Sequence, residues 1–394
     1  MRILFTLNPW WENKEWEEKD KQLVEFEAME IKWIPKWLNN VSIKPFSLNF
    51  LVGPRQVGKT TGIKLLIREL VRRNRYGVFY LDVELLKDLE ELREAILFYN
   101  KIKEENKIKN SYIFLDEVTA IKEWWRIIKG FIDSGILSND VITVSGSSSL
   151  RILKHKEAFP GRRGFGKDVE VLPLSFPEFL EVHGVDLNRI STFKKEIEDL
   201  FLAYQEVGGF PKSINKMSFL KDLIRSIESE IEKVDKNTLT LKQIISTIYE
   251  MVPSAMSFNS IANKIGISHK TVESYLEDLE DLFVVKIVYH KDKRVNYRKE
   301  KKIFIRDPFL AKSLALWCNK ELRKDFLSES IVQEHMFRKF DEIFYYRNTY
   351  EIDCVANNLR VEVKAGKPHR KYPKNVLILE EKDIPEFLIK LLHT

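Results

Sequence analysis

The chain has 394 residues, of which 44% are hydrophobic and 31% charged, and its formal net charge is +6 at pH 7. This length predicts two or three domains with real cores, while the mild positive charge permits nucleic-acid binding without establishing it. No apolar run approaches the ~20 residues of a membrane span, and residues 1–10 lack a signal-peptide pattern, so we expect a cytoplasmic protein. The two cysteines, Cys318 and Cys354, exclude a cysteine-based zinc site and make a disulfide framework implausible. A composition rich in Lys and Glu but poor in Gln is typical of hyperthermophiles.

The first 45 residues form an arm that is rich in tryptophan. A charged helical stretch from Glu12 to Glu30 lies among five indole side chains: Trp10, Trp11, Trp16, Trp33 and Trp37. Large aromatic side chains gain most from burial. We therefore predict that they pin the arm onto the domain that follows, with partner binding as the alternative.

A phosphate-binding motif follows the apolar run Phe46–Val52. Residues 53–60 match G-x-x-x-x-G-K-[ST] and precede a helical stretch, which is the context that the motif requires. Gly53 and Gly58 let backbone N–H groups point at phosphates, Lys59 reaches the β- and γ-phosphates, and the Thr60 hydroxyl ligates Mg²⁺. We therefore expect ATP and Mg²⁺ to bind along the whole loop: Gly53, Pro54, Arg55, Gln56, Val57, Gly58, Lys59, Thr60 and Thr61.

Two later strands carry polar residues where they end. The apolar run Tyr112–Leu115 is followed by Asp116, which can hold Mg²⁺ through water, and by Glu117, which can polarise the attacking water. A third strand, Val141–Ser145, leads to Ser147. Its hydroxyl could sense the γ-phosphate or position water, or it could simply belong to a serine-rich loop.

Short apolar runs alternate with helical segments from Pro45 to about Pro173. This alternation predicts a mostly parallel sheet with helices on both faces. The expected strands are Phe46–Val52, Gly77–Val83, Tyr112–Leu115, Val141–Ser145 and Val169–Leu172. We expect a P-loop ATPase core over residues 46–186. Residues 187–236 are helical in pattern, apart from Gly208–Pro211, and suit a small lid over the nucleotide.

Residues 237–310 have the pattern of a winged helix. Apolar positions recur at helical spacing on both sides of Gly266, and Phe283–Tyr289 and Ile303–Ile305 would form the hairpin that follows. If the domain binds DNA, the second helix enters a groove with His269 and Lys270, and the hairpin tip contacts phosphates with Lys291, Lys293 and Arg294. The rest of that helix is acidic, so a winged helix that packs against protein is an equal alternative.

A second set of charged residues lies in residues 311–394. Glu334 is on a helical stretch, Asp353 on the strand Glu351–Val355, and the next strand carries Glu362 and Lys364 on one face. Asp353 and Glu362 could hold Mg²⁺ while Lys364 orients a water and stabilises charge on a phosphate. Such a strand alone is usually a solvated face, but the combination with two more acidic positions indicates a metal-dependent site that acts on phosphates.

Taken together, the motifs resemble the AAA+-type ATPases of archaea and bacteria that carry a C-terminal domain of the DUF4143 class. The resemblance spans nearly the whole chain, at Asn8–Trp11, Gly53–Thr61, Leu115–Glu117, Ser145–Ser147, Gly161–Arg162, Pro173–Phe179, Gly208–Pro211, Lys302–Asp307 and Val361–Lys364. It implies an α/β protein with an AAA+-type P-loop sheet, a helical lid, a winged helix-turn-helix, and a C-terminal domain folded like PD-(D/E)xK restriction endonucleases.

The resemblance also implies roles for single residues. Arg162, in the Gly161–Arg162 pair, would sense the γ-phosphate, although the neighbouring Arg163 competes for that role. One position departs from the nuclease pattern, because Ile352 stands where a proline usually precedes the metal-binding Asp353. Inactive nuclease-like folds are common, so membership alone does not establish cleavage.

These observations predict an ATP-hydrolysing protein that acts on DNA through its winged helix, with a candidate Mg²⁺-dependent nuclease at its C-terminus. The alternative is a nucleotide-dependent regulatory switch that holds a protein partner and carries an inactive nuclease-like domain. DNA should accelerate ATP hydrolysis in the first case and have little effect in the second.

Overall fold

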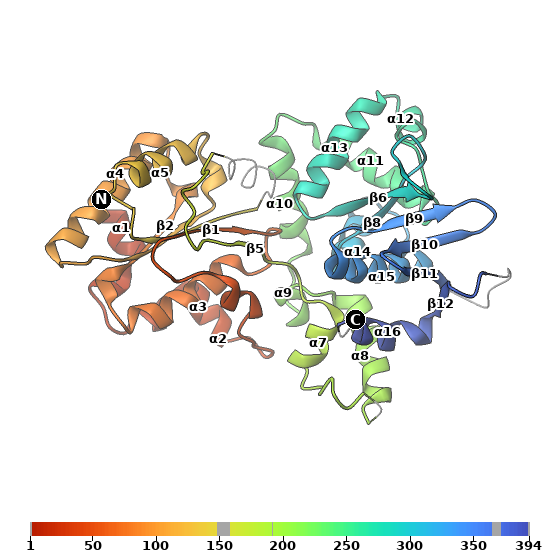
Figure 1. The fold of residues 1–394 in the computed structure, drawn as a ribbon, viewed down its shortest axis with the longest axis horizontal. Helices are drawn as coiled ribbons and strands as arrows, with labels where there is room; N and C mark the ends of the chain where they lie inside the picture. The colour runs from red at the N-terminus through yellow and green to blue at the C-terminus, as the bar shows by residue number, and fades with distance from the viewer. Residues whose placement is uncertain (1, 148–157, 191, 365–371, 393–394) are drawn as a thin grey trace. The chain divides into compact units, whose positions relative to one another are not determined.

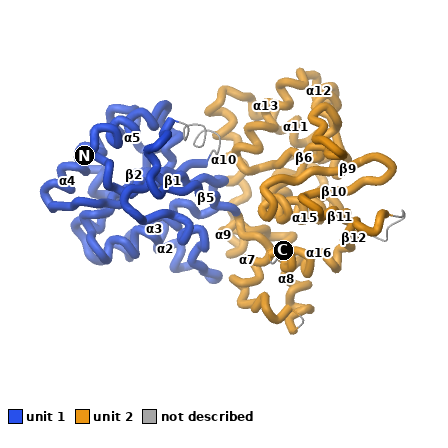
Figure 2. The backbone as a smooth tube through the Cα atoms, viewed as in Figure 1, with its two compact units in different colours: residues 1–172 blue, residues 173–394 orange. Residues whose placement is uncertain are grey.

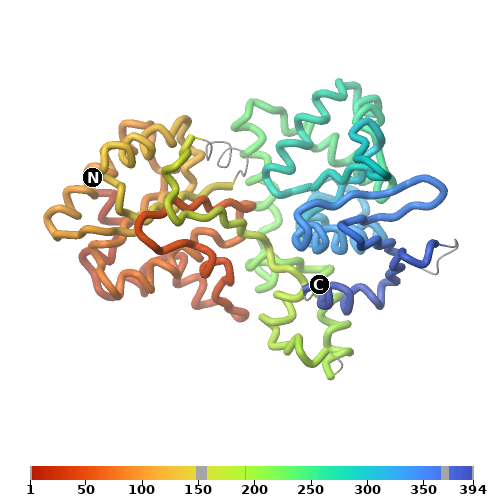
Figure 3. Tube along the Cα trace, viewed as in Figure 1, coloured from red at the N-terminus to blue at the C-terminus, as the bar shows by residue number. Residues whose placement is uncertain are grey.

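The computed structural model describes residues 2–147, 158–190, 192–364 and 372–392. The chain divides into two compact units, Met1–Leu172 and Pro173–Thr394 (Figure 2). Figure 3 follows the path of the chain through unit 1 and then unit 2. The expected helical lid therefore falls within unit 2, as do residues 173–186 of the expected core. The finer division into core, lid, winged helix and final domain remains a prediction.

Unit 1 is built on a five-stranded parallel sheet in the order β2-β3-β4-β1-β5. Every residue of β1 and β4 is buried, as expected for strands that helices cover on both faces. This confirms the predicted parallel α/β sheet. The strands are β1 Ser47–Val52, β2 Val78–Asp82, β3 Tyr112–Asp116, β4 Val141–Gly146 and β5 Asp168–Glu170.

The helices of unit 1 cover the two faces of this sheet. In Figure 1, α2 and α3 lie on one side, and α4 and α5 on the other. The start of α4 is fixed by Asp88, whose carboxylate accepts hydrogen bonds from the N–H groups of Glu90 and Glu91. The helices are α1 Arg2–Leu7, α2 Lys21–Glu27, α3 Lys59–Val71, α4 Leu89–Glu105 and α5 Trp124–Asp133.

The N-terminal arm packs on β2, the edge strand of the sheet. The indole N–H groups of Trp10 and Trp11 both donate to the carbonyl of Val78, at 3.1 and 3.0 Å. The Asn8 side chain accepts from the Tyr80 N–H at 2.7 Å and donates to the Tyr80 carbonyl at 2.9 Å. These bonds satisfy an edge that would otherwise offer unpaired groups to another strand. The predicted packing of the aromatic arm is thus confirmed for these tryptophans.

Unit 2 contains a mixed sheet in the order β12-β11-β10-β9-β6-β7, and β8 pairs with β6 outside this path. Because β6 pairs in parallel with β9, the strands of the expected wing and those of the C-terminal region form one sheet. The strands are β6 Val285–Lys291, β7 Val295–Asn296, β8 Lys302–Ile305, β9 Phe344–Arg347, β10 Glu351–Ala356, β11 Leu359–Lys364 and β12 Leu377–Glu380.

The segment predicted to be a winged helix forms two helices and a pair of antiparallel strands in unit 2, and we keep the name winged helix for it. Helices α12 and α13 are joined at Gly266, whose φ of 74° suits glycine, and Ser257 and Ser268 cap their N-termini. Strands β6 and β8 then form the antiparallel wing. The helices of unit 2 are α7 Phe176–Val182, α8 Lys194–Val207, α9 Pro211–Ile214, α10 Leu220–Glu232, α11 Thr238–Met251, α12 Phe258–Ile265, α13 His269–Asp281, α14 Pro308–Trp317, α15 Lys324–Phe340 and α16 Ile384–Lys390.

A buried histidine joins α15 to α7. His335 Nε2 accepts a hydrogen bond from the Phe176 N–H at 2.8 Å, and its Nδ1 lies 2.7 Å from the Ile331 carbonyl. This pattern requires the neutral ring with its proton on Nδ1. Burial, with a smaller effect of Arg338, lowers the pKa of His335 from 6.5 to about 4.

Unit 2 should therefore lose stability in acid. The unfolded chain takes up a proton on this histidine near pH 6.5, whereas the folded state resists it, so the stabilisation is complete above pH 6.5 and fades toward pH 4. Because the pKa of His335 is lowered to about 4 in the folded state, the free energy of unfolding should fall by about 3 kcal/mol as the pH drops through this range. We expect His335→Gln to flatten the difference in urea-unfolding free energy between pH 7.5 and 4.5, measured by circular dichroism. His183→Gln, at a half-buried histidine, should leave this difference unchanged. If the wild type and both variants show the same difference, His335 is not the cause of the acid sensitivity.

Candidate nucleotide site and acidic cluster

The phosphate loop connects β1 to α3, and both glycines of the motif are required by its backbone. Gly58 stands before Lys59 with a φ of 94°, in the left-handed region that favours glycine. At Gly53 a Cβ atom would lie 2.0 Å from the carbonyl oxygen of Val171, so no side chain fits. The loop thus ends at the N-terminus of a 13-residue helix, whose first N–H groups and dipole favour a bound phosphate.

Lys59 and Thr60, the first two residues of α3, lie on the carboxyl edge of the sheet. The buried Lys59 ammonium donates to the carbonyls of Gly53 and Pro54 at 2.7 and 2.9 Å and lies 3.9 Å from Glu117 Oε1. The Thr60 hydroxyl donates to Asp116 Oδ2 at 2.7 Å. Thr60 and Asp116, the two residues predicted to share Mg²⁺, are therefore in direct contact.

Asp116 is held by groups from neighbouring strands. Besides Thr60, it accepts hydrogen bonds from the Tyr80 hydroxyl of β2 at 3.1 Å and from the Ser145 hydroxyl of β4. Our sequence reasoning did not assign Tyr80 or Ser145 to this site. The available signal was their place near the ends of strands that flank β3, because polar side chains at the carboxyl ends of parallel strands converge.

Glu117 and Ser147 supply buried polar atoms at the same edge. Glu117 has a φ of 51°, and its N–H donates to the Ser145 hydroxyl at 3.2 Å. Within the described residues, Glu117 Oε2 and Ser147 Oγ are buried without a hydrogen-bond partner. Buried polar atoms are normally satisfied, so these two fit a site that receives a phosphate, a water and a cation. Burial raises the pKa of Glu117, although the Lys59 ammonium opposes this effect.

Arg162 does not lie at the phosphate loop of its own chain. Its guanidinium pairs with Asp133, the last residue of α5, and donates to the Pro160 carbonyl at 3.0 Å. The neighbouring Arg163 carbonyl accepts from the N–H of Leu48, near the start of β1. The loop begins at the other end of that strand, roughly 15 Å away at 3.3 Å per residue. Contact between Arg162 and a γ-phosphate would therefore require the loop of another molecule, and the role remains a prediction.

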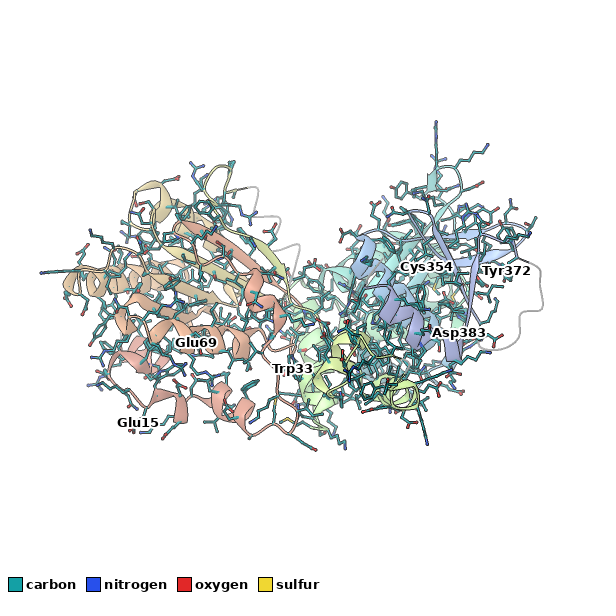
Figure 4. All side chains as sticks on the ribbon, turned by 60° about the horizontal axis from the view of Figure 1, so that its bottom comes forward. Glu15, Trp33, Glu69, Cys354, Tyr372 and Asp383 are labelled. Carbon is teal, nitrogen blue, oxygen red and sulfur yellow. The ribbon has the colours of Figure 1, made fainter. Side chains whose placement is uncertain are left out.

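In unit 2, four acidic residues gather around two lysines, in a group that we call the acidic cluster: Glu329, Glu351, Asp353, Glu362, Lys302 and Lys364. Asp353 and Glu362 lie on adjacent strands, and the Asp353 N–H donates to Glu362 Oε2 at 3.1 Å. Lys364 pairs with Glu362, which also accepts from the hydroxyl of Tyr372 at 2.9 Å. Tyr372, and Cys354 next to Asp353 in the sequence, are labelled in Figure 4. The structure thus brings together Asp353, Glu362 and Lys364, as the strand pattern predicts.

Glu334, which was predicted to act with these residues, is held instead by two arginines, and its role at the site remains a prediction. It accepts two hydrogen bonds from Arg306, at 3.0 and 3.2 Å, and one from Arg338 at 2.7 Å. These arginines lower the pKa of Glu334 although burial opposes them. Glu329 takes its place in the cluster. It precedes Glu334 by five residues on α15, and at 100° per residue the two side chains point about 140° apart.

The centre of the acidic cluster is occupied by the Lys302 ammonium. This side chain comes from β8, is 2% exposed, and lies 2.8 Å from Glu329, 2.9 Å from Glu351 and 2.5 Å from Asp353. Burial alone would lower the pKa of Lys302, but the three carboxylates outweigh it and raise the pKa well above its usual range. Burial, then Asp353, raises the pKa of Glu329 to about 8 and that of Glu362 to about 7.

The residues of the acidic cluster do not fit the predicted metal site. In the ranges that the structure describes, no three His, Cys, Asp or Glu side chains are placed to hold a metal ion. The assignment of Asp353 and Glu362 as metal ligands is therefore not supported by their surroundings. Lys302 was quoted only as the first residue of the Lys302–Asp307 motif, because the pattern of one segment does not show which distant carboxylates it meets.

The predicted DNA-contacting residues lie on the surface of the winged helix. His269 and Lys270 are exposed at the N-terminus of α13, and Lys293 and Arg294 are exposed at the wing tip. Lys291 is half-buried, with its ammonium 4.2 Å from the centre of the Phe344 ring. The same wing also exposes Arg298 and Lys299, which sequence reasoning missed. They could have been found from the sequence, because they lie a few positions after the basic wing tip.

Comparison with known proteins assigns a class to part of the chain. Residues 46–180 match a family model described as an AAA domain, and residues 198–321 match one described as a domain of unknown function, DUF8612. The second model differs from the DUF4143 class that the motifs suggested. Residues 46–180 are thus an AAA-type P-loop domain, and the phosphate-loop motif lies at the carboxyl edge of its sheet.

A relative and several solved structures are similar over longer stretches. An uncharacterized protein of Methanocaldococcus jannaschii, MJ1544, is 25% identical over 336 residues, which cover 80% of this chain and 73% of that protein. The Aeropyrum pernix ORC2 protein, solved in ADPNP-ADP complexes, matches 76% of this chain and 94% of its own at 13% identity and a TM-score of 0.41. The Aeropyrum pernix ORC1 protein in complex with DNA matches 68% of this chain and 86% of its own, at 13% identity and a TM-score of 0.31. Among the helices of the described residues, none combines the length and apolarity needed to cross a membrane.

Proposed function

We propose that this protein binds ATP with Mg²⁺ at the phosphate loop, hydrolyses it, and uses that cycle to act on DNA through its winged helix. The observation that carries the proposal is the convergence of five predicted residues on one edge of the unit 1 sheet. They come from the start of α3 and from the residues at, or directly after, the ends of β3 and β4: Lys59, Thr60, Asp116, Glu117 and Ser147.

Each of these groups has a distinct role in the proposed reaction. Lys59 would leave its carbonyl partners for the β- and γ-phosphates, while Thr60 and Asp116 would hold Mg²⁺. When Mg²⁺ is bound, it neutralises part of the negative charge on the phosphates. Glu117, whose Oε2 is buried without a partner in the described chain, orients the attacking water and accepts its proton. Ser147, buried in the same way, donates its hydroxyl to the γ-phosphate or to that water.

The winged helix is the part of unit 2 that suits DNA. Lys270 at the start of α13 and Lys293 and Arg294 at the wing tip are exposed and cationic, as groups that bind phosphates must be. Exposed Glu273 and Glu277, further along α13, favour the second candidate, in which this surface holds a protein partner and the ATPase acts as a switch. Their carboxylates would repel a DNA backbone that lay along the whole helix.

The two candidates are separated by the effect of DNA on turnover. The steady-state rate of ATP hydrolysis should be measured with duplex, single-stranded and branched DNA and without DNA. We expect at least one form to stimulate hydrolysis several-fold. An unchanged rate with every form, together with salt-independent or absent DNA binding, would favour the regulatory switch.

The basic residues of the winged helix should govern DNA binding. Replacing Lys270, Lys291, Lys293 and Arg294 by Ala should weaken binding at low salt by at least about tenfold. The slope of log K against log[salt] should also become shallower by about one for each phosphate that no longer has a cationic partner. The matched control is an equal change of charge on exposed lysines of unit 1, made with Ala at Lys87, Lys101, Lys107 and Lys109. Fluorescence anisotropy with a labelled duplex at several salt concentrations measures both effects, and equal slopes for the two variants would contradict a DNA-binding wing.

A further inference from the structure

The acidic cluster already contains a cation that belongs to the protein. Lys302 Nζ contacts three carboxylates, from Glu329 on α15 and from Glu351 and Asp353 on β10, all within 2.9 Å. A divalent ion held by these oxygens would need nearly the same position. We propose that the Lys302 ammonium permanently takes the place of a metal ion, so that the C-terminal sheet is a nuclease-like scaffold that does not cleave nucleic acid by metal chemistry.

Geometry makes the lysine and a metal ion mutually exclusive. Mg²⁺ binds oxygens at about 2.0–2.1 Å and demands near-octahedral coordination. Both oxygens of Asp353 are already engaged, because Oδ1 accepts from Lys302 and Oδ2 accepts from the Val363 N–H at 2.8 Å, and the ammonium stands on the side of Oδ1 that a shared metal ion would need. Glu362 is similarly engaged, since Oε2 accepts from the Asp353 N–H and Oε1 from Lys364 and Tyr372.

Lys302 also has no way to withdraw from the cluster. Its backbone lies in β8, paired with Val288 of β6, and its side chain is fully enclosed. A metal ion that entered would leave this ammonium buried beside it, and an unpaired buried charge costs several kcal/mol. The ammonium instead ties β8 to α15 and β10. The proposal is independent of ATP hydrolysis in unit 1, so either can fail without the other.

Metal binding to the full-length protein tests the proposal, with Mn²⁺ alone as the probe and its free signal followed by electron paramagnetic resonance. Without nucleotide, the wild type and Asp353→Asn should bind the same amount of Mn²⁺. Lys302→Met should gain one Mn²⁺ site that the wild type lacks, at least ten-fold tighter than any Mn²⁺ binding by the wild type without nucleotide. The double variant Lys302→Met/Asp353→Asn should lose that site again. Lys302→Arg, which keeps a cation, and Lys301→Met, at the buried neighbour, should gain none.

Three results would overturn the proposal. The first is wild-type Mn²⁺ binding that disappears in Asp353→Asn, and the second is cleavage of plasmid DNA in Mg²⁺ or Mn²⁺ that disappears in Lys364→Ala. The third is a folded Lys302→Met protein that binds no more Mn²⁺ than the wild type. ATP hydrolysis by unit 1 and circular dichroism report whether each variant is folded. If Lys302→Met does not fold, the wild type compared with Asp353→Asn and Lys364→Ala decides the question alone.

Discussion

Lys59→Ala should reduce ATP hydrolysis by at least about a thousandfold, because loss of a charge-stabilising group in a phosphoryl-transfer site has effects of this order. The Lys59 ammonium is buried at the loop, where it contacts the carbonyls of Gly53 and Pro54. A phosphate bound in the loop would therefore lie close to this positive charge. Among the described residues, the other cation at the loop, Arg55, is held by Glu84 at 2.7 Å. We expect nucleotide affinity to fall as well.

Steady-state phosphate release and equilibrium binding of a fluorescent ATP analogue measure these two effects. Arg72→Ala, an exposed charge at the end of the same helix, is the control and should keep both properties. Normal turnover by Lys59→Ala would remove the basis for assigning the nucleotide site to this loop. A loss shared by Arg72→Ala would instead indicate that α3 had been destabilised.

Glu117→Gln should separate binding from turnover. The substitution keeps the shape of the side chain and leaves Asp116 free to hold Mg²⁺ with Thr60, but it removes the carboxylate that takes a proton from water. We expect the turnover number to fall by about a hundredfold or more, as for loss of a general base, while ATP affinity changes by less than about threefold. Because burial raises the pKa of Glu117, the acid limb of the wild-type pH–rate profile should lie above pH 4.5.

Single-turnover kinetics on preformed enzyme–ATP complexes report the chemical step directly. Glu94→Gln, at an exposed glutamate on α4, is the matched control and should behave like the wild type. A Glu117→Gln protein that lost affinity more than rate would show that this carboxylate serves the metal or the fold. Retention of normal turnover would mean that another group activates the water.

Local sequence was enough to predict which residues meet at the carboxyl edge of the unit 1 sheet. Gly53, Gly58, Lys59 and Thr60 lie within eight consecutive positions, so the motif itself brings them together. Asp116 joins them because the chain alternates strands and helices, and parallel strands place their carboxyl ends at a common edge. The period-2 pattern likewise put Glu362 and Lys364 on one face.

What the sequence by itself determined, then, was encoded over short distances: the phosphate loop, the parallel strands of unit 1, the turn of the winged helix at Gly266 and the basic wing tip. The helical stretch expected from Glu12 to Glu30 is an α-helix only over Lys21–Glu27. Only the tertiary structure decided which distant charges meet. Lys302 and Glu329 are 27 positions apart yet 2.8 Å from each other, Glu334 turned toward Arg306 instead of the strands, and Arg162 settled beside Asp133. The physical reason is that long-range ion pairs depend on how helices are rotated against sheets. A shift of a few residues along α15 changes the side of the helix on which a carboxylate lies. The periodicity of one segment does not specify which side of a neighbouring segment packs against it.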